Sequence, residues 1–342
     1  MSLRALAFPG FAHLWRLTDG RGLLEHALLD VPRREHGYCV DDVARALVLL
    51  CREPAPDPVA HEMAGRFLQF VLDAVTADGR THNRMSTDGS WTERPDVGDW
   101  WGRAVWGLGV AAAHGPDAES RHRARVGLHR AGRARSPYLH ANAFAALGAA
   151  DLLAAAPGDQ IARQLLGDCV AEVQARVDAS CRDWPWPEQR LRYANGALAE
   201  ALIAGGQCLG DRTALDDGLL LLDFLLHVES RHGHLSVTPV GGRSRHDRGP
   251  GFDQQPIEVS SLADACARAY RATGDLRWLE GVRMAWGWFV GDNDAGTEMV
   301  DWHTEGGYDG LSADGPNLNQ GAESTLALLS TAQHARRLGQ TP

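Results

Sequence analysis

Two adjacent aspartates, Asp41 and Asp42, stand at the start of an apolar stretch with helical spacing. One carboxylate is enough to cap a helix N-terminus, so capping explains either residue but not both. Adjacent carboxylates repel each other, which raises the pKa of one and separates an acid from a base. Neighbouring helical positions set the two carboxyl groups roughly 5 Å apart, which suits an acid and a nucleophile that act on one bond. The pair therefore predicts acid–base chemistry.

Three glutamates near other predicted helix starts are reserve candidates for the same chemistry: Glu188, Glu258 and Glu323. In the first turn of a helix, a glutamate is by default a capping residue, and this alternative stays open for Glu258 and Glu323. In a functional role, one of the three would replace either aspartate in a wider, inverting arrangement.

Aromatic, amide and histidine side chains gather beside these carboxylates in the same short clusters. Flat aromatic faces stack on the apolar face of a sugar, and amides and carboxylates hydrogen-bond its hydroxyl groups. A tryptophan taken alone is more often a core residue, so the prediction depends on the clustering. The expected substrate-binding residues are His36, Tyr38, Asp99, Trp100, Trp101, Arg103, His140, Asn142, Trp186, Tyr193, Asn195, Asp253, Gln254, Gln255, Trp302, His303, Asp309, Asn319 and Gln320.

The clusters fall at the start of nearly every second predicted helix. Apolar residues at three- and four-residue spacing predict helices in pairs that repeat every forty to sixty residues or so. The predicted ranges are 10–29, 42–51, 59–75, 100–113, 118–131, 139–155, 160–179, 195–209, 213–228, 258–272, 276–290 and 320–338. Six pairs predict an all-α (α/α)6 toroid as a single domain over residues 1–342, with every cluster at one rim. A helical-repeat solenoid is the alternative, and 234–239 is the one candidate hairpin arm.

Composition excludes several other classes. The net charge is −10, the sequence contains arginine but no lysine, and no long basic stripe favours nucleic acid or an anionic membrane. No run approaches the roughly 20 apolar residues of a membrane span, and no signal peptide is evident. The six scattered cysteines indicate reduced thiols and a cytoplasmic protein. No metal or cofactor is expected, because His140 and His303 lack ligand spacing and phosphate-binding loops are absent.

Three runs resemble a known bacterial family: His-Gly-Tyr-Cys-Val-Asp-Asp (36–42), Phe-Asp-Gln-Gln-Pro-Ile-Glu (252–258) and Asn-Gln-Gly-Ala-Glu-Ser (319–324). They look like a helical-toroid domain that occurs alone or fused behind a family-4-type glycosyltransferase, often near mannoside phosphorylases. The resemblance runs from about residue 19 to the C-terminus. It implies a six-hairpin fold, carbohydrate chemistry and a functional association with a glycosyltransferase. The aspartate pair alone also resembles the catalytic pair of the family 76 endo-α-1,6-mannanases, which are toroids too.

We therefore expect a glycoside hydrolase that acts on an oligosaccharide, with mannose-containing glycans as one candidate. Asp41 and Asp42 would serve as the acid/base and the nucleophile or base. The sequence departs from the first family at Val43, Pro187 and Ala194, where that family has Asn, an aromatic residue and an acid. These departures leave the carboxylates in place and concern substrate specificity.

Three alternatives remain open from the sequence. A phosphorylase would use the same pocket with inorganic phosphate, and the arginines of the loop 241–249 would favour it: Arg243, Arg245 and Arg248. A sugar 2-epimerase would need histidine bases, for which His36, His140 and His303 are available. A non-catalytic domain would only bind glycans or accompany a glycosyltransferase, since fold alone does not decide function.

Overall fold

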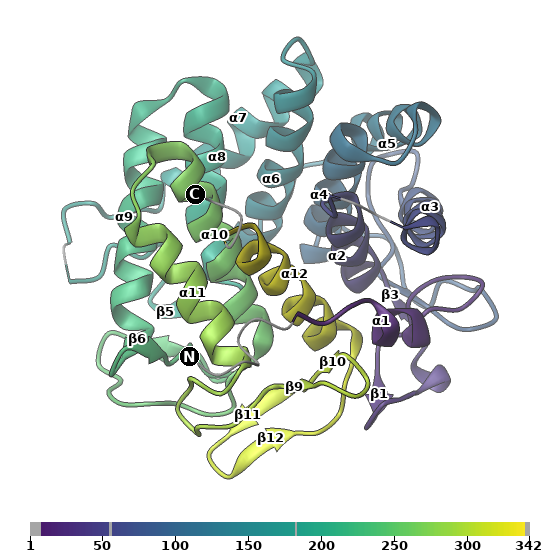
Figure 1. Cartoon of the computed structure of the whole chain (residues 1–342). Coiled ribbons are helices and arrows are strands. Elements are labelled where there is room, and N and C mark those ends of the chain that lie inside the picture. The colour runs from purple at the N-terminus through teal and green to yellow at the C-terminus, as the bar shows by residue number, and fades with distance from the viewer. Residues whose placement is uncertain (1–7, 55–56, 182, 339–342) are drawn as a thin grey trace.

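Six helices form a closed inner ring in the computed structural model, which describes residues 8–54, 57–181 and 183–338. They are α2 (Val40–Cys51), α4 (Asp99–His114), α6 (Leu139–Ala155), α8 (Gly196–Leu209), α10 (Pro256–Thr273) and α12 (Ala322–Leu338). Each packs against the next, and α12 packs back on α2, so the ring closes (Figure 1). The predicted (α/α)6 toroid is confirmed.

The outer layer alternates with the inner one along the chain. It contains α1 (Ala12–Leu17), α3 (Pro58–Ala74), α5 (Ala118–Ala131), α7 (Gln160–Gln174), α9 (Arg212–Val228) and α11 (Arg277–Phe289). The prediction of one helix over 10–29 was wrong, because α1 ends at Leu17. The Asp19 carboxylate accepts the backbone N–H groups of Arg21 and Gly22 and closes a turn there. Local side-chain bonds of this kind compete with helix formation.

The two layers begin their helices differently. Four outer helices start at an aspartate whose side chain caps the first turn: Asp57, Asp117, Asp159 and Asp211. Among the inner helices, α2, α4, α6, α8 and α10 have no hydrogen bond from the side chain of the N-cap residue. The polar residues at the inner helix starts therefore do not cap their own helices in the ordinary way.

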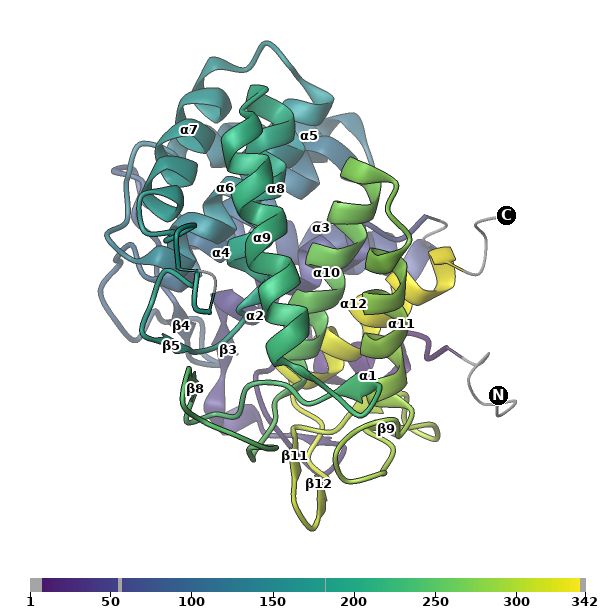
Figure 2. The same cartoon turned by 90° about the vertical axis from the view of Figure 1, so that its left-hand side faces the viewer.

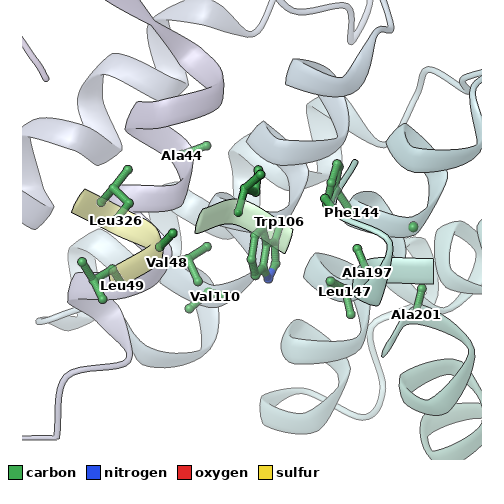
Figure 3. Close-up of a cluster of buried hydrophobic side chains, with 14 of the residues drawn as sticks. Ala44, Val48, Leu49, Trp106, Val110, Phe144, Leu147, Ala197, Ala201 and Leu326 are labelled. Atoms are coloured by element: carbon green, nitrogen blue, oxygen red, sulfur yellow. The ribbon is translucent and has the colours of Figure 1, made fainter. Parts of the chain in front are cut away.

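Large apolar side chains fill the middle of the ring (Figure 3). Trp106, Phe144 and Leu326 come from three different inner helices and meet there, and only a void of about 40 Å³ remains. Inner helices are buried on nearly all sides, as α6 shows. At the contact of α4 with α6, a Cβ added to Gly109 would collide with the backbone carbonyl of Gly148, so glycine permits the close approach.

Short strands and long loops cover one end of the ring, as Figure 2 shows for β3, β4, β5 and β8. The strands are β1 (Ala27–Leu28), β2 (Val31–Pro32), β3 (Tyr38–Cys39), β4 (Arg84–Met85), β5 (Arg190–Leu191), β6 (Ser230–Arg231), β7 (His234–Leu235), β8 (Arg243–Ser244), β9 (Val300–Asp301), β10 (Gly306–Gly307), β11 (Gly310–Ser312) and β12 (Gly315–Asn317). They pair antiparallel as β1–β2, β3–β4, β5–β8, β6–β7, β9–β10 and β11–β12. The expected hairpin arm at 234–239 is thus only β7, which pairs with β6. No described helix is long and apolar enough to cross a membrane.

Candidate active site

The N-terminal ends of α2, α4, α10 and α12, together with the loops beside them, line a cavity of about 530 Å³. Eight of the residues singled out in the sequence line it: Asp41, Asp42, Asp99, Trp100, Tyr193, Gln255, Asp309 and Glu323. They are far apart in the sequence, and the closed ring brings them together. We call this space the carboxylate cavity.

Asp41 faces two guanidinium groups. Its Oδ2 atom lies 3.3 Å from Nη2 of Arg45, and its Oδ1 atom lies 3.5 Å from Nε of Arg103. The side chain is 24% exposed, so the carboxylate remains accessible from the cavity. An accessible carboxylate therefore lies between two guanidinium groups.

Asp42 lies deeper than Asp41, with an exposure of 3%. Nη2 of Arg45 donates a hydrogen bond of 2.5 Å to its Oδ1 atom. Burial, together with the charges of Glu323 and Asp41, nevertheless raises the pKa of Asp42 to about 8 against the opposing effect of Arg45. Asp42 is therefore mainly a neutral acid at pH 7.

Arg45 connects three of the carboxyl groups. Besides its bonds to the two aspartates, it donates from Nη1 to Oε2 of Glu323 at 2.9 Å. Its side chain is only 9% exposed, whereas that of Glu323 is 42% exposed. Arg45 thus fixes Asp41, Asp42 and Glu323 relative to one another and leaves Glu323 open to a ligand.

A fourth carboxyl group, Asp99, faces Asp41 across the contact of α2 with α4. Burial and the charge of Asp41 raise the pKa of Asp99 to about 6, against the effects of Arg103 and of a hydrogen bond from the Ala141 backbone. Arg103 lies beneath, with its guanidinium 3.6 Å from the ring centroid of Phe144. Burial lowers the pKa of Arg103 to about 10, so it is still a cation at pH 7.

Tyr193 forms the aromatic wall opposite these groups. Its ring stacks on His140 with centroids 4.7 Å apart. His140 is buried, and burial lowers its pKa to about 3, so its ring is neutral. Within the described part of the chain, neither the Tyr193 hydroxyl nor Nε2 of His140 has a hydrogen-bond partner.

Glu258 holds the turn that carries Tyr193. It accepts the Ala194 N–H at 2.5 Å, the Asn195 N–H at 3.3 Å and the Asn195 side-chain amide at 2.9 Å. These bonds help to keep Ala194 in the left-handed region, at φ 46°. Burial and the nearby Glu229 raise the pKa of Glu258. Glu258 therefore fixes the turn that leads into the neighbouring helix α8, and its oxygens are already occupied.

The sequence did not identify the other lining residues of the cavity: Glu25, His26, Cys39, Arg45, Asn83, Arg84, Asn317, Gly321 and Ser324. Pairing of β3 with β4 brings Asn83 and Arg84 beside α2, and an isolated bridge from Leu24 to Tyr38 brings Glu25 there. Only Arg45 has a sequence signal, because it follows Asp41 by one helical turn.

A metal ligand set is the other possible interpretation of this wall. One ligand atom each from Glu25, Cys39 and Asp42 lies within 4.8 Å of the others. Arg84 pairs with Glu25, and Arg45 pairs with Asp42. Burial and the charges of both aspartates also raise the pKa of the Cys39 thiol, which disfavours a thiolate ligand. The residues therefore fit a hydrogen-bonded wall better than a metal site.

Besides the buried Arg103 and His140, seven predicted binding residues lie in the packed interior. Tyr38 donates its hydroxyl to Asp19 at 2.8 Å, and Trp101 donates its indole N–H to the Ala131 carbonyl at 3.1 Å. A wide ring needs large side chains inside it, and these residue types meet that need as well as they bind sugars. The seven are Tyr38, Trp101, Asn142, Trp186, Asn195, Gln254 and Gln320.

Six further predicted residues lie outside the cavity lining. Glu188 pairs with Arg192 at 3.1 Å, and Trp302 donates to Glu298 at 3.1 Å. Asn319 accepts the Leu29 N–H at 2.9 Å, which attaches one rim loop to another. The set is Glu188, His36, Asp253, Trp302, His303 and Asn319. Their polar clusters belong to the loops that support the rim.

Solved structures of low sequence identity share this architecture. A sugar epimerase from a ruminal bacterium matches with a TM-score of 0.71 at 12% identity over 97% of each chain. A cellobiose 2-epimerase from Spirochaeta thermophila matches with 0.68 at 13% identity, over 95% of this chain and 93% of the other. A GH76 alpha-mannanase from Bacteroides thetaiotaomicron matches with 0.66 at 11% identity, over 96% and 94%. These likenesses show the fold. No protein-family model matches the chain, and no curated protein matches its sequence.

Proposed function

We propose that the chain is a glycoside hydrolase that cleaves a neutral oligosaccharide in the carboxylate cavity. The observation that supports it most is the contrast between two adjacent carboxyl groups. Burial raises the pKa of Asp42 to about 8, while Asp41 is accessible and faces two guanidinium groups. A neutral acid beside a charged carboxylate is the pair that glycoside hydrolysis requires.

In this proposal Asp42 donates its proton to the glycosidic oxygen as the bond breaks. Asp41 Oδ2 and Asp42 Oδ1 lie 3.3 and 2.5 Å from the same Nη2 atom of Arg45. These two oxygens are therefore at most about 6 Å apart, which is closer to the spacing of retaining than of inverting enzymes. Asp41 would attack the anomeric carbon, and Asp42 would then activate the water that releases the sugar. Glu323 is the nearest alternative base.

The remaining lining residues suit an oligosaccharide. Trp100 and Tyr193 offer aromatic faces, and Asn83 and Gln255 offer amides for hydroxyl groups. An adjoining hollow of about 420 Å³ shares Tyr193 and Gln255 with the carboxylate cavity. A second sugar unit would lie in that hollow.

Charge argues against the phosphorylase alternative. Six carboxyl groups line the carboxylate cavity, against two arginines, so an incoming phosphate would be repelled. The three loop arginines that favoured phosphorolysis line a different cavity, which shares no residue with this one. The phosphate nucleophile thus lacks its expected binding groups.

An epimerase is the second candidate, because two of the structural neighbours named above are sugar epimerases. The expected bases His36, His140 and His303 do not line the cavity, and burial lowers the pKa of His140 to about 3. Only His26 among the described histidines lines it. A mechanism with two histidine bases therefore has one candidate where it needs two.

The experiment is a panel of neutral oligosaccharides that includes α-mannosides, incubated with and without phosphate. Hydrolysis predicts released reducing sugar that does not depend on phosphate and decreases at least 100-fold in Asp41→Asn. The matched control is Asp216→Asn on the outer helix α9, where the side chain is 63% exposed. Deuterium incorporation at C2 of an intact sugar, without hydrolysis, would instead establish the epimerase. Sugar phosphate as the only product would establish the phosphorylase.

A further inference from the structure

A second cavity, of about 470 Å³, shares no lining residue with the carboxylate cavity. One wall is the basic segment 243–248, which begins with β8, and the other wall comes from the end of α9 and from residues 183–184. We call it the arginine cavity. Its lining residues are Asp183, Trp184, Phe224, His227, Val228, Arg243, Ser244, Arg245, His246, Asp247 and Arg248.

The exposed arginines of this cavity are poorly compensated by acids. The acid paired with Arg245 is Asp183, at 3.8 Å, and the Asp183 side chain is 86% exposed. The guanidinium of Arg248 donates only to the backbone carbonyls of Arg245 and Asp247, as far as the described residues go. Asp247 pairs with Arg190, which does not line this cavity, at 3.5 Å, and it also accepts the Ser244 N–H at 2.7 Å. Positive charge therefore faces the cavity in a chain whose net charge is −10.

Arg243 anchors the base of the same wall. It is 7% exposed and donates to the backbone carbonyls of Gly249 and Ser236, each at 3.2 Å. Its Nε atom has no hydrogen-bond partner within the described residues. The buried carboxyl group of Glu229 is close enough for the charge of Arg243 to oppose the rise of its pKa, so Arg243 supports the wall from inside the protein.

Two aromatic rings form the floor of the cavity. Trp184 and Phe224 meet edge to face with centroids 5.2 Å apart, and each is 9% exposed. The indole N–H of Trp184 is bonded to the Glu188 carbonyl, so the floor presents apolar ring atoms. A floor of this kind beside arginines suits a small ligand with both an apolar face and a phosphate group.

We propose that the arginine cavity is an accessory site for a small phosphate-bearing ligand. Arg245 and Arg248 bind the phosphate from the loop, Arg243 supports them from below, and Trp184 contacts the rest of the ligand. The proposal does not depend on the reaction in the carboxylate cavity. The ligand is either free phosphate or a phosphorylated sugar. The aromatic floor would contribute to the affinity for the phosphorylated sugar but not to that for free phosphate.

The site is connected to the carboxylate cavity through the backbone. β8 pairs with β5, with Arg243 opposite Leu191 and Ser244 opposite Arg190. Two residues after β5 the chain reaches Tyr193, which lines the carboxylate cavity. A ligand that orders β8 would therefore also order the segment that carries Tyr193.

Titration calorimetry at constant ionic strength tests the proposal with inorganic phosphate, glucose 6-phosphate and glucose as separate ligands. The variant is Arg245→Ala/Arg248→Ala, whose side chains lie on an exposed loop. The control is Arg277→Ala/Arg283→Ala on α11, which removes two exposed arginines with the same change in net charge. We expect saturable binding of a phosphate compound, a Kd at least tenfold higher in the loop variant, and no change in the control.

Tighter binding of glucose 6-phosphate than of phosphate would identify a phosphorylated sugar as the ligand, and equal affinity would identify the ion. Hydrogen exchange should slow in residues 190–193 when the ligand is bound. Absence of binding up to about 10 mM of either phosphate compound, corresponding to less than roughly 3 kcal/mol of binding free energy, would overturn the proposal. Equal affinities in wild type and in the loop variant would also overturn it.

Discussion

Replacing Asp42 by asparagine should reduce turnover at least 100-fold and should also make the stability of the fold less dependent on pH. Burial raises the pKa of Asp42 from 3.8 to about 8. The folded chain therefore keeps a proton at this site that the unfolded chain releases. The extra stability that this proton gives the folded chain is fully present below about pH 4 and decreases as pH rises toward 8. Above that pH it is absent. Asparagine does not ionise, so the variant escapes this loss.

The size of the effect follows from the pKa difference. Each pH unit inside the window changes the free energy of unfolding by about 1.4 kcal/mol, so wild type loses on the order of 4 kcal/mol relative to Asp42→Asn between pH 5 and pH 8. For 342 residues the entropy of unfolding is roughly 0.7 kcal/mol/K. The Tm of the variant should therefore gain about 5 to 6 °C on wild type across this range.

Thermal melts at four pH values between 5 and 8 measure this gain. Asp216→Asn is the matched control, because it removes an exposed carboxylate of α9 that does not line the carboxylate cavity. Turnover of Asp42→Asn should be at least 100-fold below wild type at every pH, since an amide cannot donate the proton. A Tm difference that stays the same from pH 5 to pH 8 would mean that Asp42 is ionised in the fold. Asp42 could not then be the acid.

Three further predictions concern Asp41, Asp99 and Glu258. Asp41→Asn should reduce turnover by about 10² or more while its Tm stays within a few degrees of wild type, as measured by glycan hydrolysis and melts; normal turnover would transfer the nucleophile role to Glu323. Because the pKa of Asp99 is raised to about 6, Asp99→Asn should remove an inflection near pH 6 from the kcat/KM profile, and an unchanged profile would exclude Asp99 from the site. Glu258→Gln replaces one acceptor by a donor facing the Ala194 N–H, so urea unfolding should show a loss of about 1 to 3 kcal/mol. A loss of turnover without any loss of stability in this variant would make Glu258 a reacting group.

Helical periodicity was sufficient to predict the fold, because the ring consists of amphipathic and buried helices of ordinary length. It failed where side chains bond to nearby backbone groups. The range 10–29 contains enough apolar residues for a helix, yet Asp19 binds the N–H groups of Arg21 and Gly22 and the chain turns. Closure of α12 on α2 was inferred from the number of helix pairs, since no local signal encodes a contact across most of the chain.

The candidate site was predictable only where it lies on helix starts. Asp41, Asp99 and Glu323, which line one cavity, could be singled out because each belongs to a recognisable polar cluster at a helix start. Glu25 stands in a loop and Arg84 in the two-residue strand β4, both without such a cluster, and only the pairing of short strands brings them to α2. Some tryptophan and amide side chains were predicted to bind sugar but are buried in the packed interior, as Trp101 is. The sequence could not separate the two cases, because these residue types pack in an interior as readily as they bind a sugar.

Aspartates at the starts of outer and inner helices differ in the groups that their carboxylates bind. Asp211 starts the outer helix α9 and accepts two backbone N–H groups, as a capping residue should. Glu258 lies in the first turn of an inner helix, yet it binds the backbone N–H groups of the turn that precedes the adjacent helix α8. The carboxylates of Asp41 and Asp42 accept no backbone N–H group among the described residues, and both pair with Arg45 instead. Holding two carboxyl groups against one buried guanidinium stabilises no helix end, and it leaves Asp42 able to donate a proton and Asp41 able to attack. That difference in partners, rather than the doubled aspartate itself, is the strongest reason to assign the chemistry to this pair.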